Sequence, residues 1–214
     1  MKQLFCQVID SFKTCKTRGI GAGLVGLAQT AARVFYQRAD YLVLENRFSE
    51  YVAVADLRPD LVIRRVTTRE LVASLSPVTN LADMQRFYKL FDGGCVAFIA
   101  SENDRVIGYC WASQHVEGSL NRVGAALGLR AGDAYIHDLF TAEAYRGQGI
   151  GRSLLIHCLE YLYENGYERA IAAVEKDNTA SLIVTRKAGY QVMGEISHSR
   201  MLLWNRFIDG RTDI

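Results

Sequence analysis

The sequence predicts an α/β protein with a mixed β-sheet, and two patterns along the chain support this fold class. In the first half, two apolar runs joined by a polar turn at 101–104 predict an antiparallel hairpin. In the second half, runs typical of strands alternate with runs typical of helices, an order that favours parallel strands. Half of the residues are apolar and only two are proline, which suits a well-packed core.

The elements of the first half are predicted from apolar runs and from the residues that end them. Asn103 and Asp104 lie in the turn of the hairpin, and Gly93-Gly94 ends the helix before it. Strands are expected at 41–44, 61–66, 95–100 and 106–113, with a helix starting at 67–70 and a second over 81–90.

The second half begins with a glycine-containing insertion at 114–132 and continues with the alternating elements. Leu154, Leu155, Cys158, Leu159 and Leu162 recur at helical spacing, which predicts a helix with one buried face. Strands are expected at 134–140, 170–174, 190–196 and 201–207, and helices over 152–165 and 179–188.

The segment Arg146-Gly147-Gln148-Gly149-Ile150-Gly151 lies between a predicted strand and a predicted helix. Glycines leave backbone N–H groups uncovered, and the start of a helix carries unpaired donors and partial positive charge. Such a site favours a phosphate or pyrophosphate. The loop lacks the Gly-Lys-Ser/Thr ending of a Walker loop, and its spacing is not that of a dinucleotide fingerprint.

Two blocks of sequence together resemble the GNAT N-acetyltransferase superfamily. The first runs from Tyr135 to Thr141 and on through the glycine loop, and the second combines Asn178-Thr179-Ala180-Ser181 with Lys187-Ala188-Gly189-Tyr190. The similarity covers about 61–207. It implies the GNAT acyl-CoA N-acyltransferase fold, and transfer of an acyl group, usually acetyl, from coenzyme A to an amine.

The resemblance also implies which residues bind acetyl-CoA. Main-chain groups of Leu139, Phe140 and Thr141 would pair with the pantetheine arm, and Asn178 and Ser181 would contact its far side. The pyrophosphate would lie against the amides of the loop and of the helix start, which are those of Gly147, Gln148, Gly149, Ile150, Gly151 and Arg152. Arg146, the residue before the first glycine, would add positive charge.

His137 is the first candidate for the general base, because polyamine-type relatives carry a glutamate at the matching position. The ordinary pKa of histidine, near 6.5, suits a base at neutral pH, although a packed structural histidine is the alternative reading. Asp138 is a lesser candidate, since side chains alternate along a strand and a bulge is needed to bring both to one pocket. Glu175 is a third. Thr185 stands where the family often has a tyrosine as general acid, which weakens this part of the comparison.

The chain divides into an N-terminal extension at 1–60 and an acyltransferase domain at 61–214. Residues 1–40 are basic and partly glycine-rich, and we expect a helical arm packed on the domain or on a partner subunit. The alternative is an amphipathic element in peripheral contact with the inner face of a membrane. A homodimer through edge strands at 41–44 is a further alternative.

Composition narrows the class of partner and the compartment. A net charge of +2 does not favour a nucleic-acid partner. Five scattered cysteines without a Cys-x-x-Cys pair indicate reduced thiols in a cytoplasmic protein and argue against a disulfide framework or a bound metal.

The function expected is transfer of acetyl from acetyl-CoA to a primary amine of a small molecule or sugar. Two alternatives stay open. One is a long-chain acyltransferase working near a membrane, and the other is a non-catalytic acyl-CoA-binding module. The sequence does not identify the acceptor.

Overall fold

The computed structural model describes residues 36–50, 61–75, 78–113, 126–201 and 204–210. The chain divides into two compact units, one containing Tyr41–Glu195 and the other containing Ile196–Gly210 together with the residues up to Asp40. The predictions for residues 1–35 lie outside these described ranges. Among the helices that the structure describes, none combines the length and apolar character required to cross a bilayer.

The sheet is mixed, as the sequence predicts, and its strand order is β2-β3-β4-β5-β6-β1-β7, with β8 beside β7. Antiparallel ladders join β2 to β3, β3 to β4, β4 to β5 and β1 to β6, whereas β5 and β6 are parallel. The strands are β1 (Tyr36–Arg47), β2 (Val62–Arg65), β3 (Val96–Glu102), β4 (Arg105–Ser113), β5 (Asp133–Thr141), β6 (Arg169–Glu175), β7 (Gln191–Met201) and β8 (Trp204–Asp209).

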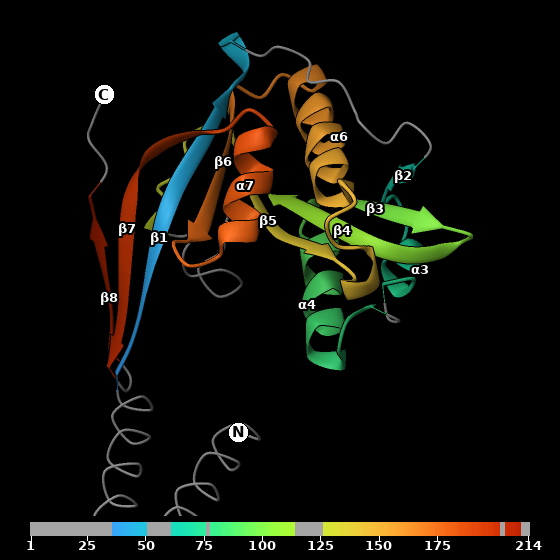
Figure 1. Cartoon of the computed structure of the whole chain (residues 1–214), viewed down its shortest axis with the longest axis horizontal. Coiled ribbons are helices and arrows are strands. Elements are labelled where there is room, and N and C mark those ends of the chain that lie inside the picture. The colour runs from blue at the N-terminus through green and yellow to red at the C-terminus, as the bar shows by residue number, and fades with distance from the viewer. Residues whose placement is uncertain (1–35, 51–60, 76–77, 114–125, 202–203, 211–214) are drawn as a thin grey trace, which may run out of the picture. The chain divides into compact units, whose positions relative to one another are not determined.

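Helices cover both faces of the sheet in the larger unit, and Figure 1 shows α4 and α6 on opposite sides of β3 and β4. One apolar core joins α6 to the sheet, and a second joins the sheet to α3 and α4. The helices are α3 (Arg69–Ala73), α4 (Leu81–Asp92), α6 (Ile150–Glu164) and α7 (Thr179–Lys187), with 3₁₀ turns η1 (Phe48–Glu50) and η3 (Glu143–Tyr145).

Within the described residues the predicted helices and strands are all present, but the strand predicted at 41–44 is much longer and is not at an edge. β1 continues through Glu45 and Asn46, two polar residues that suggest a strand end yet are buried. Each has a partner that the sequence does not reveal, since Glu45 pairs with Arg169 and Asn46 donates to the carbonyl of Ala188. Because β1 lies between β6 and β7, the alternative that an edge strand at 41–44 pairs two subunits is contradicted.

Candidate active site

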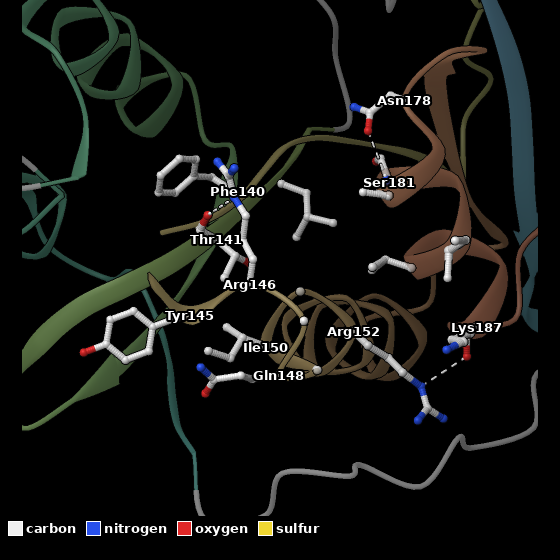
Figure 2. Close-up of a pocket in the computed structure, with 17 residues that line it drawn as sticks. Phe140, Thr141, Tyr145, Arg146, Gln148, Ile150, Arg152, Asn178, Ser181 and Lys187 are labelled. Carbon is white, nitrogen blue, oxygen red and sulfur yellow. Dashed lines mark hydrogen bonds between the residues drawn. The ribbon is translucent and has the colours of Figure 1, made fainter. Parts of the chain in front are cut away.

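A cavity of about 910 Å³ lies beside the end of β5, the glycine loop and the helices α6 and α7 (Figure 2). Its volume is within the range of small-molecule sites. The described residues that line it come from these four elements and from the end of η3: Leu139, Phe140, Thr141, Tyr145, Arg146, Gly147, Gln148, Gly149, Ile150, Gly151, Arg152, Asn178, Ala180, Ser181, Ile183, Val184 and Lys187.

The cavity lies where the two parallel strands stop pairing. The β5–β6 register runs only from Asp133–Arg169 to Ile136–Ala172. Beyond that point β5 stays paired with β4 on its other edge as far as Thr141, while β6 stays paired with β1. The edge of β5 that faces away from β4 is therefore not taken up by the β6 ladder over its last residues. Main-chain groups on this edge can pair with an extended ligand, as a further strand would.

The glycine loop brings backbone donors to the cavity. Gly147 and Gly149 have φ values of 77° and 83°, a region that costs other residues energy. Gly149 is the N-cap of α6 and has no side chain with which to cap the helix. The N–H groups of the first turn, from Ile150 onward, therefore remain as donors at the positive end of the helix dipole. This donor set fits a pyrophosphate, which is the group that acetyl-CoA would place here.

Two arginines flank the loop and are anchored through their Nε atoms. Arg146 donates to the carbonyl of Thr141 at 3.3 Å, and Arg152 donates to the carbonyl of Lys187 at 3.2 Å. Figure 2 shows both contacts at the margin of the cavity. Since Nε carries each contact, the terminal nitrogens of both guanidinium groups stay available to an anion.

Helix α7 forms the opposite wall, and Asn178 begins it. The side-chain carbonyl of Asn178 accepts from the N–H of Ser181 at 3.1 Å, so Asn178 is the N-cap of the helix as well as a lining residue. Thr185 is buried, and its hydroxyl donates to the carbonyl of Ser181 at 2.8 Å. This hydroxyl is committed to its own helix and does not replace the tyrosine usual in the family.

A β-bulge in β5 puts His137 and Asp138 on the same face of the sheet. His137 pairs with Trp111 of β4 and Phe140 pairs with Tyr109, so the two β5 residues between them lie opposite a single β4 residue. Asp138 has a φ of 52°, in the left-handed region. The bulge breaks the alternation of side chains along the strand. Both residues therefore face α4, whereas Leu139 faces α6.

The carboxylate of Asp138 connects His137 to an arginine of α4. Asp138 Oδ2 lies 2.7 Å from Nδ1 of His137, and the carboxylate also accepts two hydrogen bonds from Arg86. Burial disfavours the charge of Asp138, but the hydrogen bonds from His137 and Arg86 outweigh this effect and hold the pKa of the carboxyl at about 2. Asp138 is therefore ionised at neutral pH.

All the residues expected to bind the cofactor lie around one cavity, whereas His137 and Asp138 are absent from the described residues that line it. They directly precede the β5 residues of the cavity wall, of which Leu139 packs on the other face of the strand and Phe140 packs on the face of His137. Sequence reasoning missed five lining residues: Tyr145, Ala180, Ile183, Val184 and Lys187. Three of them, Tyr145, Ala180 and Lys187, stand inside the two sequence blocks of the resemblance. It also missed Gly108, where an added Cβ would lie 2.8 Å from the carbonyl oxygen of Phe140. No sequence signal pointed to Arg86.

This mixed sheet, opened between its parallel strands next to a glycine loop and a helix start, defines the acyl-CoA N-acyltransferase fold class. The model of the GNAT acetyltransferase family matches residues 65–190, so the chain belongs to this family. The resemblance seen in the sequence is thereby confirmed.

Curated relatives share part of their length with this chain. The mycothiol acetyltransferase of Amycolatopsis mediterranei (strain U-32) is 38% identical over 93 residues, which cover 44% of this chain and 29% of the relative. The mycothiol acetyltransferase of Saccharomonospora viridis is 32% identical over 98 residues, which cover 45% of this chain and 30% of the relative. Each match therefore spans less than a third of the relative's own length.

Solved structures share the fold. A Drosophila protein aligns with a TM-score of 0.58 at 14% identity, covering 86% of this chain and 58% of that chain. A GCN5-related N-acetyltransferase from Sphaerobacter thermophilus aligns with a TM-score of 0.56 at 14% identity, covering 89% and 58%. At these identities the likeness concerns the fold alone.

Proposed function

We propose that this chain is an N-acetyltransferase that moves acetyl from acetyl-CoA to a primary amine of a small molecule or sugar. The observation that carries this proposal is the convergence of β5, the glycine loop, α6 and α7 on one cavity. Membership of the GNAT acetyltransferase family supports the same reaction class. The relatives named mycothiol acetyltransferase support a small acceptor, although they match only part of their length.

Acetyl-CoA supplies an acetyl group already activated as a thioester. The chain would hold the pyrophosphate with the amides from Gly147 to Arg152 and with the two flanking arginines. Main-chain groups of Leu139, Phe140 and Thr141 would hold the extended arm and polarise the thioester carbonyl. Asn178 and Ser181 would contact the arm from α7.

His137 is the base in this proposal, acting directly or through a water molecule. An amine with a pKa near 10 is unprotonated in about one molecule in a thousand at pH 7. Removal of its proton by a positioned group contributes roughly 10²–10⁴-fold to the rate. Nδ1 of His137 is occupied by Asp138, so Nε2 is the nitrogen left to accept that proton. A thiol of ordinary pKa, about 8.5, can leave as the thiolate without a dedicated acid.

A non-catalytic acyl-CoA-binding protein is the second candidate function, and one observation favours it. The position where the family often has a tyrosine holds Thr185, whose hydroxyl is bonded within its own helix. Binding would survive this change, because Thr185 is not among the described residues that line the cavity.

The proposal is tested by thermal-shift titration with free CoA, acetyl-CoA and a long-chain acyl-CoA, followed by a thiol-release assay over a panel of amines. A ligand at 100 times its dissociation constant should stabilise the fold by about 2.7 kcal/mol. Stabilisation by acetyl-CoA together with amine-dependent thiol release supports the acetyltransferase. Stabilisation without turnover on any amine supports the binding protein, and a marked preference for the long chain points to a long-chain acyltransferase. No response to any of the three ligands contradicts the proposal.

A further inference from the structure

We propose that Arg86 of α4 is a positioning residue that acts on His137 through Asp138. It holds the Asp138 carboxylate so that the proton of the neutral imidazole stays on Nδ1 and Nε2 is left as the acceptor. This inference rests on the proposed function, in which His137 is the base. Arg86 belongs to neither sequence block that carries the family resemblance.

The geometry of the contact is that of a bidentate pair. Nη1 of Arg86 donates to Oδ2 of Asp138, and Nη2 donates to Oδ1 at 3.0 Å. Two parallel bonds fix the plane of a carboxylate as well as its distance. The same Oδ2 lies 2.7 Å from Nδ1 of His137. The three side chains therefore form one chain of contacts from α4 to the centre of β5.

Asp138 needs such a constraint because of its position. It lies in the bulge with a φ of 52°, and its side chain is 25% exposed. A short acidic side chain at such a turn has other acceptable orientations, including bonds to nearby backbone N–H groups. The guanidinium of Arg86 favours the orientation that meets His137. Arg86 is itself held by Asp83 at 3.4 Å and lies 5.0 Å from the ring centroid of Phe87.

The consequence for His137 concerns its tautomer. An ionised carboxylate can only accept hydrogen bonds, so Nδ1 must be the protonated nitrogen. In a free neutral imidazole side chain the Nε2–H form prevails, and that form cannot accept a proton at Nε2. The ring is also held in place, since its side chain is only 4% exposed and it stacks on Tyr135 with 5.5 Å between the centroids.

Other groups face this trio from the packed elements. Trp111 of β4 lies opposite His137, and Tyr109 of β4 packs against Phe87 of α4. Burial, followed by the negative charge of Asp138, raises the pKa of Tyr109 to about 12, so its phenol stays neutral. Asp83 is a second carboxylate near Arg86, but its contact is longer and it is more exposed than Asp138. Asp138 is thus the main partner of the guanidinium.

A purely structural clamp between α4 and the sheet is the competing reading, and the chain offers a matched control for it. Arg69 also contacts α4, with its guanidinium 5.0 Å from the ring centroid of Tyr88 and 3.2 Å from Asp92. It does not touch Asp138. Arg86→Gln removes contacts that α4 makes with β5, and Arg69→Gln removes contacts that α3 makes with α4, but only Arg86 reaches His137 through Asp138.

The experiment measures the ¹⁵N chemical shifts of His137 in the full-length protein without ligand, at alkaline pH where imidazoles are neutral. We expect the wild type and Arg69→Gln to show protonated Nδ1, and Arg86→Gln and Asp138→Asn to shift toward protonated Nε2.

In amine-dependent thiol release, Arg86→Gln should lower kcat by about tenfold or more. The KM for acetyl-CoA should change by less than about twofold, because Arg86 is not among the described residues that line the cavity. Arg86→Lys, which keeps the charge without the fork, should restore only part of kcat.

An unchanged His137 tautomer in Arg86→Gln overturns the proposal, as does an equal loss of kcat in Arg69→Gln. The spectroscopic measurement does not depend on turnover. If the wild type shows no acetyl transfer, the proposed function fails, and the ¹⁵N shifts still decide whether Arg86 sets the tautomer.

Discussion

At the scale of single residues, backbone conformation decides what the site can hold. Gly147 lines the cavity with a φ of 77°, and a Cβ added there would meet no described atom within 4 Å. Gly166, just after α6, has the same φ and the same open surroundings, but it does not line the cavity. An L side chain in this region costs about 1–2 kcal/mol. A side chain at either glycine should therefore cost the same backbone strain, but only a side chain at Gly147 would lie at the cavity.

We therefore expect Gly147→Ala and Gly166→Ala to lose similar unfolding free energy, about 1–2 kcal/mol each. Only Gly147→Ala should lower the affinity for acetyl-CoA, by about tenfold or more, because its methyl group would occupy space that the pyrophosphate needs for close approach. Denaturant titration and isothermal calorimetry measure the two quantities. Equal affinity in both variants would remove the glycine loop from the binding site.

At the scale of secondary structure, the helices begin at residues that the sequence marks clearly. Asn178 caps α7 by accepting from Ser181 at 3.1 Å, and Asn80 caps α4 by accepting from Asp83 at 3.0 Å. Both caps do the same work for the helix, since each satisfies one donor of the first turn. Asn178 also lines the cavity, which Asn80 does not. The pair separates the structural role of Asn178 from its expected contact with the cofactor.

Asn178→Ala and Asn80→Ala should each lower the unfolding free energy by about 1 kcal/mol, because each removes one N-cap. If Asn178 also contacts the pantetheine arm, its variant alone should raise the dissociation constant for acetyl-CoA, by roughly tenfold for a lost hydrogen bond of about 1.5 kcal/mol. Chemical denaturation and equilibrium binding test this. Matching affinities in the two variants would leave Asn178 with only a capping role.

Element boundaries were predicted less well than element types, and the errors have specific causes. Helix α6 begins at Ile150, two residues before the predicted start, because the glycine loop turns into the helix without a conventional capping residue. Strand β7 continues to Met201 through the polar residues Ser197–Ser199. Such polar residues end an apolar run in the sequence, and a strand is therefore predicted to end there. In the structure the strand continues, because hydrogen bonds to β8 pair this part of β7.

At the scale of the whole molecule, the unit that holds the cavity begins at Tyr41. The segment from Tyr41 to Arg47 pairs with β6 from Glu175 to Arg169, and Val43 and Leu44 within it are fully buried. Residues before this segment contribute no described residue to the cavity. The described residues that line the cavity therefore all belong to the unit that begins at Tyr41.

Deleting residues 1–40 should leave a folded protein that is still stabilised by acetyl-CoA. Deleting residues 1–47 should abolish folding, because it removes a strand of the sheet and buried side chains worth several kcal/mol. Circular dichroism and thermal-shift titration of both truncations check these outcomes. Loss of the folded domain in the shorter deletion would show that the extension belongs to the core.

The sequence by itself determined the element types, the mixed sheet and the glycine loop at a helix start. These features depend on periodicity and turn residues within short windows, so they can be seen without the fold. Through the family resemblance it also led to a set of expected cofactor-binding residues, all of which line one cavity together with residues that were not predicted.

Tertiary structure alone decided which distant groups meet. The bulge turns Asp138 onto the face of His137, and Arg86 arrives from 52 positions earlier in the chain. Gly108 permits an approach to Phe140 that a Cβ would prevent, although nothing near it in the sequence marks a special role. Such contacts depend on strand register and on helix packing across the sheet. Both are set by long-range burial, which no local pattern encodes.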